Sequence, residues 1–485
     1  MDLQRPSLPQ RSEPSLVVAL AVAAMGVYSL IVIGATTAVL EGATACPTWP
    51  TCHGQWLVGL DDPALVVAWT HRVATLVVGA VLVVTAVIAW RSSASRRVRL
   101  ALGIAMALYP VQMGIGALAA TVGASPVLTG THLVVAMGIF SSLLVALLWQ
   151  LESAVSRELA PFAPGSDGTA NRWPSADETD DGKPVPPVDS SPGGGDWGWR
   201  RQIRAYFRLT KPKLWWLLCL VALSAMALAA GPTLSPALAA TTLLGGVLAI
   251  AASGTFNNVI ERDRDRWMER TNDRPLVDGR LPVRNAVALG LLLATTSVAV
   301  FLAFVNPLSA GLALLAIVYY SLIYTVILKP HTPQNIVIGG AVGAFPALIG
   351  WAAVENSIGL SAMALGAVIF LWTPAHFYNL ALVFREDYDR AGFPMLPVVR
   401  GDDITRRHIL AYLGATLLAT AGLGTATRLD WVYALAAATV GGVFLWAVIR
   451  LYAERNRRAA WRAFHASNAY LGIVFLAIFV DVVIV

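Results

Sequence analysis

The sequence predicts an all-α membrane protein. Of its 485 residues, 56% are hydrophobic and only 13% are charged, whereas a soluble globular chain carries roughly 25% charged residues. The apolar residues fall into long runs, and at about 20 residues for each crossing we expect about 13 transmembrane helices. A transmembrane β-barrel would show short alternating segments instead. An ordinary soluble enzyme, a coiled coil and a disordered regulator are therefore excluded.

Two groups of apolar runs are separated by a stretch of different composition. The first group lies near 15–40, 64–90, 98–121 and 126–150. Residues 151–205 are rich in Pro, Gly, Ser, Asp and Glu, a composition that cannot bury a core and predicts a flexible linker. The second group lies near 213–231, 236–256, 283–304, 308–328, 335–354, 359–381, 408–427, 430–450 and 465–485. We therefore expect a membrane domain at 1–150, a linker at 151–205 and a second membrane domain at 206–485.

Arg and Lys are concentrated in alternate loops. The loops at 257–282, 329–334, 382–407 and 451–462 are basic, whereas the loop at 41–63 is poor in both residues. The positive-inside rule then places the N-terminus and the basic loops in the cytoplasm, as expected for a multi-pass protein of the cell membrane. The net charge of +6 follows from this pattern, so we expect no nucleic-acid partner.

An acidic stripe follows the sixth apolar run, in NNVIERDRDRWMERTNDRPL. Asn257, Glu261 and Asp265 are spaced i, i+4, i+8, so they share one helix face, and Asp263 adds a carboxylate nearby. Oxygen ligands of this kind suit Mg²⁺ bridged to substrate phosphates, and Arg270 and Arg274 belong to the guanidinium groups that could hold phosphate oxygens. The alternative is a solvated basic loop.

A second acidic cluster follows the tenth run, in FREDYDRAGFPMLPV. It contains Glu386, Asp387 and Asp389, and on the predicted topology both clusters are cytoplasmic. Together they could bracket a diphosphate through Mg²⁺, with Lys329 as a further phosphate contact. The alternatives are an ordinary charged loop for the cluster and a topology determinant for the lone lysine.

Residues 206–485 resemble the UbiA-type prenyltransferases, in the branch that farnesylates heme. The resemblance rests on YFRLTKPK, NNVIERDRDRWMERTNDRPL, LKPHTPQNIVIGGAVGAFPALIGW, WTPAHFYNLAL and DYDRAGFPMLPV, in that order. It implies a nine-helix bundle with a cytoplasm-facing cavity, farnesyl diphosphate and protoheme IX (heme B) as substrates, heme O as product, and Mg²⁺.

The resemblance also implies roles for individual residues. Asn257, Glu261 and Asp265 would bind Mg²⁺ and diphosphate, although the family usually has Asp where this chain has Glu261. Asp263, Arg270 and Arg274 fall on the same motif. Asp387 matches the second motif, with Glu386 and Asp389 beside it.

Histidines inside apolar runs are candidates for heme contacts, because ionisable residues in membrane helices are commonly functional. His376, in WTPAHF, could ligate or orient heme iron, or could be a hydrogen-bonded structural residue. His71 and His132 lie at similar depths in the second and fourth runs, as bis-histidine heme ligation requires. Each of these two could also be structural.

Cys46 and Cys52 lie in CPTWPTC, in the first extracytoplasmic loop of the predicted topology. That compartment permits a disulfide, although free thiols or a metal site with His53 remain alternatives. Residues 15–150 resemble one half of heme A synthase, through CPTWPTC, His71 and His132 among other residues. The family usually has a catalytic Glu where this chain has Ala68, so the resemblance implies heme binding and leaves the conversion of heme O to heme A open.

Three alternatives to a heme-farnesylating fusion protein remain. The N-terminal domain could be an inert heme-binding unit, the chain could transport heme or another anionic lipid, or a b-type electron-transfer module could be fused to a prenyltransferase of another acceptor. The expected partners are the two substrates and the lipid bilayer, with a heme A synthase or assembly factors of terminal oxidases as candidate protein partners.

Overall fold

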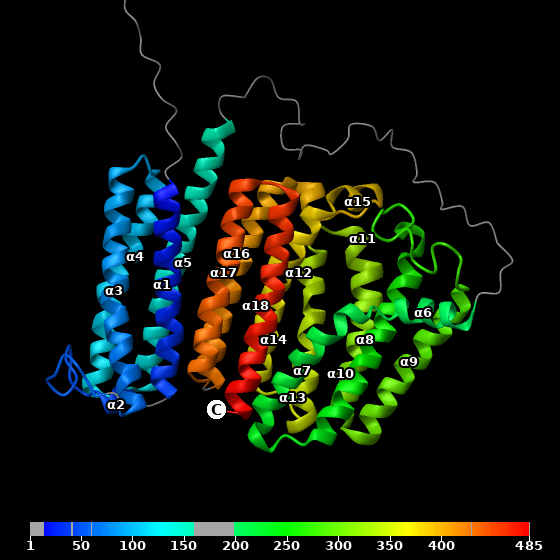
Figure 1. Cartoon of the computed structure of the whole chain (residues 1–485), viewed down its shortest axis with the longest axis horizontal. Coiled ribbons are helices and arrows are strands. Elements are labelled where there is room, and N and C mark those ends of the chain that lie inside the picture. The colour runs from blue at the N-terminus through cyan, green and yellow to red at the C-terminus, as the bar shows by residue number, and fades with distance from the viewer. Residues whose placement is uncertain (1–13, 40–41, 60, 160–197, 428, 485) are drawn as a thin grey trace, which may run out of the picture. The chain divides into compact units, whose positions relative to one another are not determined.

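A computed structural model describes residues 14–39, 42–59, 61–159, 198–427 and 429–484 of the chain (Figure 1). These residues are almost entirely helical, and they contain no β-strand beyond an isolated bridge between Cys52 and Gln55. In the described residues, 13 helical segments are long and apolar enough to cross a membrane. The predicted all-α, multi-pass fold is therefore confirmed.

The chain divides into two compact units. One comprises Met1–Asp167 with Gly441–Ala453, and the other comprises Gly168–Val440 with Glu454–Val485. The helices before residue 160 are α1 (Pro14–Val39), α2 (Gly42–Ala45), α3 (Pro63–Arg91), α4 (Arg96–Val122) and α5 (Pro126–Leu159). The four long helices pack in a closed ring, with α1 on α3, α3 on α4, α4 on α5 and α5 on α1.

The remaining helices begin after residue 198. They are α6 (Trp199–Leu209), η2 (Pro212–Leu214), α7 (Trp215–Ala230), η3 (Gly231–Thr233), α8 (Pro236–Asp265), α9 (Val283–Phe304), α10 (Pro307–Val318), η4 (Tyr319–Leu328), α11 (Lys329–His331), α12 (Asn335–Gly339), η5 (Gly340–Ala344), α13 (Phe345–Glu355), α14 (Leu360–Val383), α15 (Arg385–Arg390), α16 (Leu396–Thr427), α17 (Trp431–Glu454) and α18 (Arg457–Val483). Of these, η4 is a π-helix. Short helices such as α11, α12 and α15 interrupt or join the long apolar ones.

Helices occupy both ends of the segment predicted as a linker. The structure continues α5 to Leu159 and begins α6 at Trp199, while 160–197 lies outside the described residues. Both ends are rich in charged residues, so hydropathy alone does not indicate a helix there. A kink at Gly401, where φ is 80°, divides α16, and the part after this kink also begins before the apolar run predicted near 408–427.

Glycines allow α8 and α9 to pack closely. An added Cβ at Gly245 of α8 would lie 2.7 Å from the ring of Phe301 in α9, and one at Gly290 of α9 would lie 2.6 Å from the ring of Phe256 in α8. Small residues that accept a large neighbour are typical of helix contacts in membranes. This reciprocal pair fixes α8 immediately before Asn257, where its polar stripe begins.

Candidate active site

The polar stripe of α8 is buried and paired with basic side chains. Asn257 is 2% exposed, Glu261 is 4% exposed and Asp265 is fully buried. Their basic partners come from three other parts of the chain. Lys211 donates to Asn257, Lys329 pairs with Glu261, and Arg274 Nη1 lies 2.5 Å from Asp265 Oδ2. The predicted i, i+4, i+8 stripe is therefore the centre of a buried charged cluster.

Lys211 reaches this cluster from the turn between α6 and η2. Its backbone adopts a left-handed conformation with φ of 51°, and its amino group lies 3.3 Å from the Tyr320 hydroxyl. Burial lowers the pKa of Lys211 to about 7, and the neighbouring Arg274 guanidinium acts in the same direction. The Lys211 ammonium is therefore less stable here than in water, and an arriving anion would stabilise it.

The π-helix η4 places polar groups against the stripe. Asn257 donates to Thr325 Oγ1 at 3.1 Å, and that hydroxyl donates to the backbone oxygen of Tyr320 at 2.8 Å. The next helix, α11, begins with Lys329, the partner of Glu261. π-Helical segments are rare and are frequent at functional sites, and this ten-residue one brings Tyr320, Thr325 and Lys329 to the same cluster.

The second acidic segment braces the loop that follows α8. Asp387 accepts hydrogen bonds from the backbone N–H groups of Glu269 at 3.1 Å and Arg270 at 3.3 Å, and from Arg390 at 2.5 Å. Arg270 in turn donates to the Tyr388 hydroxyl at 3.2 Å. Burial alone would lower the pKa of Arg270, but Tyr388 and Asp387 raise it, so this guanidinium stays charged.

An aromatic side chain closes the space between the two segments. The Phe393 ring centroid lies 4.4 Å from Lys329 Nζ and 4.9 Å from the Arg264 guanidinium. Phe393 is 1% exposed. These cation–π contacts keep water away from the Glu261–Lys329 pair, which strengthens its electrostatics.

Of the ten site residues predicted in and around the two acidic segments, the structure brings seven together and leaves three elsewhere. Those in the connected cluster are Asn257, Glu261, Asp265, Arg270, Arg274, Lys329 and Asp387. Asp263 instead has a 64% exposed side chain that pairs with Arg262 and Arg266, because it lies two residues from Glu261 and so points to the opposite side of α8. Glu386 and Asp389 are exposed on α15.

His376 is packed among aromatic rings of α14 and α18. Its imidazole stacks on Trp372 at 4.3 Å and on Phe464 at 4.4 Å between centroids. Its Nδ1 lies 2.7 Å from the Ser467 hydroxyl, and the residue is 6% exposed. Both faces of the ring are therefore covered, and a contact between His376 and heme stays a prediction.

Sequence reasoning missed Lys211, Tyr320, Tyr388 and Phe393. Lys211 stands in the LTKPK block, where it reads as one of several basic residues before a span. Tyr320 gave no signal, because no periodicity distinguishes a π-helix from the α-helix around it.

The cluster offers oxygen atoms for a divalent cation. Among the described residues, no three His, Cys, Asp or Glu side chains converge as a complete metal site. Asp265 Oδ1, however, is buried with no hydrogen-bond partner, and Asn257 and Glu261 contribute oxygens on the same helix face. This donor set fits Mg²⁺, which commonly takes one or two carboxylates and completes its shell with phosphate and water.

The two predicted heme ligands of the N-terminal unit have matching surroundings. A Cβ added at Gly34 of α1 would lie 3.3 Å from His71 of α3, and one at Gly116 of α4 would lie 3.1 Å from His132 of α5. In both imidazoles Nδ1 is buried with no hydrogen-bond partner in the described structure. The two histidines are near enough to interact electrostatically.

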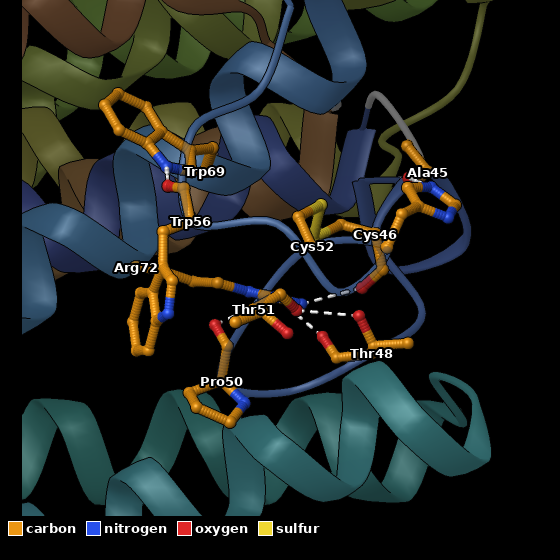
Figure 2. The surroundings of a disulfide bond; sticks show 10 residues. Ala45, Cys46, Thr48, Pro50, Thr51, Cys52, Trp56, Trp69 and Arg72 are labelled. Atoms are coloured by element: carbon orange, nitrogen blue, oxygen red, sulfur yellow. Dashed lines mark hydrogen bonds between the residues drawn. A yellow bond between two sulfur atoms is a disulfide. The ribbon is translucent and has the colours of Figure 1, made fainter.

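A disulfide joins Cys46 and Cys52, whose Cα atoms are 5.1 Å apart. Figure 2 shows Arg72, the residue after His71, reaching into this loop. Its guanidinium donates to the carbonyl oxygens of Cys46 at 2.7 Å, Thr48 at 2.7 Å and Thr51 at 2.9 Å. Arg72 therefore holds the disulfide loop against the helix that carries His71.

Two further contacts fasten the loop to its surroundings. Trp69 donates through Nε1 to the Trp56 carbonyl at 2.7 Å, and His53 Nε2 lies 2.9 Å from the Ala45 carbonyl. Ala68, one turn before His71, is 4% exposed and packs in an apolar cluster with both cysteines. The position where the heme A synthase family usually has Glu thus faces the disulfide here.

The fold is that of an integral-membrane prenyltransferase. A model described as the UbiA prenyltransferase family matches residues 217–477. The chain belongs to this family, which confirms the resemblance inferred from its motifs.

Curated relatives match nearly the whole chain. One named Protoheme IX farnesyltransferase, from Halobacterium salinarum (strain ATCC 29341 / DSM 671 / R1), is 51% identical over 476 residues, which cover 97% of this chain and 98% of the relative. Another of the same name, from Haloarcula marismortui, is 51% identical over 462 residues, which cover 95% of this chain and 97% of the relative. The likeness therefore extends through the N-terminal helices.

A solved structure shares the fold of the second unit. It is described as digeranylgeranylglyceryl phosphate synthase, and it matches 59% of this chain and 99% of its own chain with a TM-score of 0.50 and 16% sequence identity. At this identity the likeness concerns the fold alone.

We predict that the two carboxylates Asp263 and Asp265 differ sharply in importance. Asp265→Asn should lower the rate of prenyl transfer by at least about 100-fold if this buried carboxylate lies beside the diphosphate, because the substitution removes its charge. Asp263→Asn makes the same chemical change on the exposed face and should leave the rate near that of the unchanged protein. Release of diphosphate in membranes measures both rates, and equal losses in the two variants would contradict the assignment.

We also predict that Arg72 protects the disulfide. Arg72→Ala removes four charge-assisted hydrogen bonds to the loop, so reduction by dithiothreitol should accelerate by at least about tenfold. Trapping of the freed thiols followed by mass spectrometry measures the rate. Arg91→Ala, at the other end of α3, is the matched control, and an unchanged reduction rate in Arg72→Ala would show that the loop holds itself.

Proposed function

We propose that this chain transfers the farnesyl group of farnesyl diphosphate to a vinyl group of protoheme IX, giving heme O and diphosphate. The observation that carries the proposal is the buried cluster of carboxylates and basic side chains around α8. The names of the curated relatives support the choice of donor and acceptor.

Diphosphate recognition is assigned to the basic members of the cluster. Lys211, Lys329, Arg270 and Arg274 stand against the three carboxylates Glu261, Asp265 and Asp387. There are four basic groups and three carboxylates, so the basic groups have hydrogen-bond donors left for a further anion. A diphosphate would compete for these donors, and Lys211, which is bonded to a neutral amide, is the most readily recruited.

A bound Mg²⁺ would neutralise charge on the departing diphosphate, and Asn257, Glu261 and Asp265 are the residues that would hold it. As the bond between farnesyl C1 and oxygen breaks, its electron pair leaves with the diphosphate, and Lys329 and Arg274 stabilise that charge. The vinyl group supplies the electron pair of the new carbon–carbon bond. Water then adds to the resulting cation and loses a proton, which gives the hydroxyethylfarnesyl side chain.

The surroundings of the cluster suit this reaction. Phe393 and Tyr320 cover Lys329 and Lys211, and exclusion of water delays capture of the allylic cation. The basic loops on either side of the cluster support a position at the cytoplasmic surface of the cell membrane, where a diphosphate would enter from water while the farnesyl chain lies in the bilayer.

The proposal is tested by the hemes that the chain produces. We expect heme O when the full chain is expressed in membranes that lack both heme-modifying steps and is supplied with farnesyl diphosphate and Mg²⁺. Extracted hemes are separated by chromatography with mass detection, and Asp265→Asn in the same membranes is the control. Unmodified heme B alone, with folded protein present, would contradict the proposal.

For the N-terminal unit we propose bis-histidine heme binding by His71 and His132. The buried, unpartnered Nδ1 atoms and the glycines opposite each ring support it, since a neutral imidazole is the form that ligates iron. Ala68 favours a unit that binds heme without oxidising it, because the disulfide occupies the surroundings of that position. Candidate protein partners are then a heme A synthase or an oxidase assembly factor.

We predict that His71→Ala and His132→Ala each abolish the absorption spectrum of low-spin heme in the purified chain. His53→Ala, which alters a histidine of the nearby loop, should retain the spectrum. All three variants should still produce heme O, because the farnesyl-transfer cluster is in the other unit. Heme A appearing in cells without another synthase would show that the N-terminal unit is catalytic despite Ala68.

A further inference from the structure

Helix α6 presents an apolar stripe that the described protein does not cover. Trp199, Ile203 and Phe207 repeat at i, i+4 and i+8 and are 67%, 58% and 50% exposed. Other residues of the same helix pack against the protein. Ala205 and Leu209 are buried in an apolar cluster with Leu276, Leu281 and Ala286. The apolar stripe is therefore additional to the face that docks α6.

Arginines form a second stripe on α6. Arg200, Arg201 and Arg204 are exposed, and no ion pair of theirs is found within the described residues. Arg208 belongs to the same side of the helix but pairs with Asp273 at 2.7 Å. At 100° for each residue, the arginine stripe lies about a quarter to a third of a turn from the apolar stripe. This division is typical of helices that lie in a membrane interface.

The position of α6 agrees with that division. Its docked face contacts Leu281 and Ala286, at the beginning of the span of α9, and its C-terminal end leads directly into the span that begins at Pro212. Figure 1 shows α6 running across the direction of α8 and α9. Spans begin at the level of the lipid headgroups. A helix at this level contacts the headgroups with the faces that the protein does not cover.

The exposed aromatic surface continues from α6 into α7. Phe207 makes an edge-to-face contact with Trp215 at 5.4 Å between centroids, and Trp216 is 58% exposed beside it. Trp and Tyr are enriched where spans leave the hydrocarbon region. The stripe on α6 is thus continuous with Trp215 and Trp216 at the start of the membrane-spanning helix α7.

From these observations we propose that α6 is an interfacial anchor that binds the anionic phospholipid headgroups of the bilayer. Trp199, Ile203 and Phe207 enter the acyl region, and Arg200, Arg201 and Arg204 bind headgroup phosphates. Charge complementarity selects this occupant, since three guanidinium groups that have no carboxylate partner among the described residues lie beside an apolar stripe and match an anionic lipid surface. The anchor does not depend on the identity of the prenyl acceptor.

The test uses the full chain in vesicles of phosphatidylcholine with increasing phosphatidylglycerol. A spin label is attached to Ile203→Cys in a Cys219→Ala background, which leaves the Cys46–Cys52 disulfide as it is. The accessibility of the label to oxygen and to a water-soluble nickel complex reports its depth. A label at Arg201→Cys, on the opposite side of α6, is the companion measurement. We expect position 203 to be accessible to oxygen and position 201 to the nickel complex.

Neutralising the arginine stripe separates headgroup binding from simple insertion. Arg200→Gln, Arg201→Gln and Arg204→Gln together should at least about double the phosphatidylglycerol fraction needed for half-maximal insertion, or abolish the dependence on it, since each basic residue near the surface adds to the attraction. The matched control changes Arg96, Arg97 and Arg99 to Gln, three exposed arginines at the start of α4. This control should not move the midpoint for position 203.

Three results would overturn the proposal. In the first, the label at position 203 stays accessible to the nickel complex at every lipid composition. In the second, its protection depends on protein concentration, which would assign the stripe to a second copy of the chain. In the third, its protection disappears when Asp177, Glu178, Asp180 and Asp181 are neutralised, which would assign the arginines to that acidic segment.

Discussion

The second unit depends on one electrostatic constraint, which is that buried carboxylates on α8 must be paired. Glu261 and Asp265 have almost no contact with solvent, and removing the partner of a buried ion typically destabilises a protein by about 3 to 5 kcal/mol. Lys329 lies 68 residues from its partner Glu261 in the chain, whereas Arg274 lies only nine residues from its partner Asp265. Pairing therefore draws the start of α11 and the loop after α8 onto one helix end. The same pairing leaves the basic groups poised to exchange a carboxylate for a diphosphate.

The first half of α8 makes apolar packing contacts, and its second half makes polar contacts. In its first half, Gly245 accepts Phe301 and fixes the distance to α9. In its second half, Asn258 donates to the backbone oxygen of Leu209 at 3.1 Å, which ties the end of α6 to the residue beside Asn257. The first half of α8 fixes the position of the helix against α9. The second half carries the polar side chains of the candidate site. The turn that holds Lys211 is thereby attached to a rigid element, as an active site requires.

Periodicity was sufficient to predict the spans and the polar stripe, but not the partners of the stripe. Hydropathy identifies 13 spans because the bilayer demands long apolar helices whose backbone groups are satisfied internally. The spacing of Asn257, Glu261 and Asp265 places them on one face, and the same geometry could have excluded Asp263, two residues from Glu261. Lys211 and Tyr320 could not be found in this way, since their contacts depend on a left-handed turn and a π-helix. Nor does the sequence reveal that Asp387 accepts from the backbone N–H groups of Glu269 and Arg270, because this contact is made only by tertiary folding.

In the N-terminal unit the disulfide loop contacts α3 on both sides of His71. Ala68 packs on Cys46 and Cys52 one turn before His71, and Arg72 holds the carbonyl oxygens of the same loop one residue after it. A carboxylate at position 68 would have to be desolvated against the disulfide, which is costly without a partner. The guanidinium of Arg72, on the same helix, already donates to four carbonyl groups of the loop. In this chain Ala68 therefore leaves no carboxylate one turn before His71, which agrees with the proposal of a unit that binds heme without oxidising it.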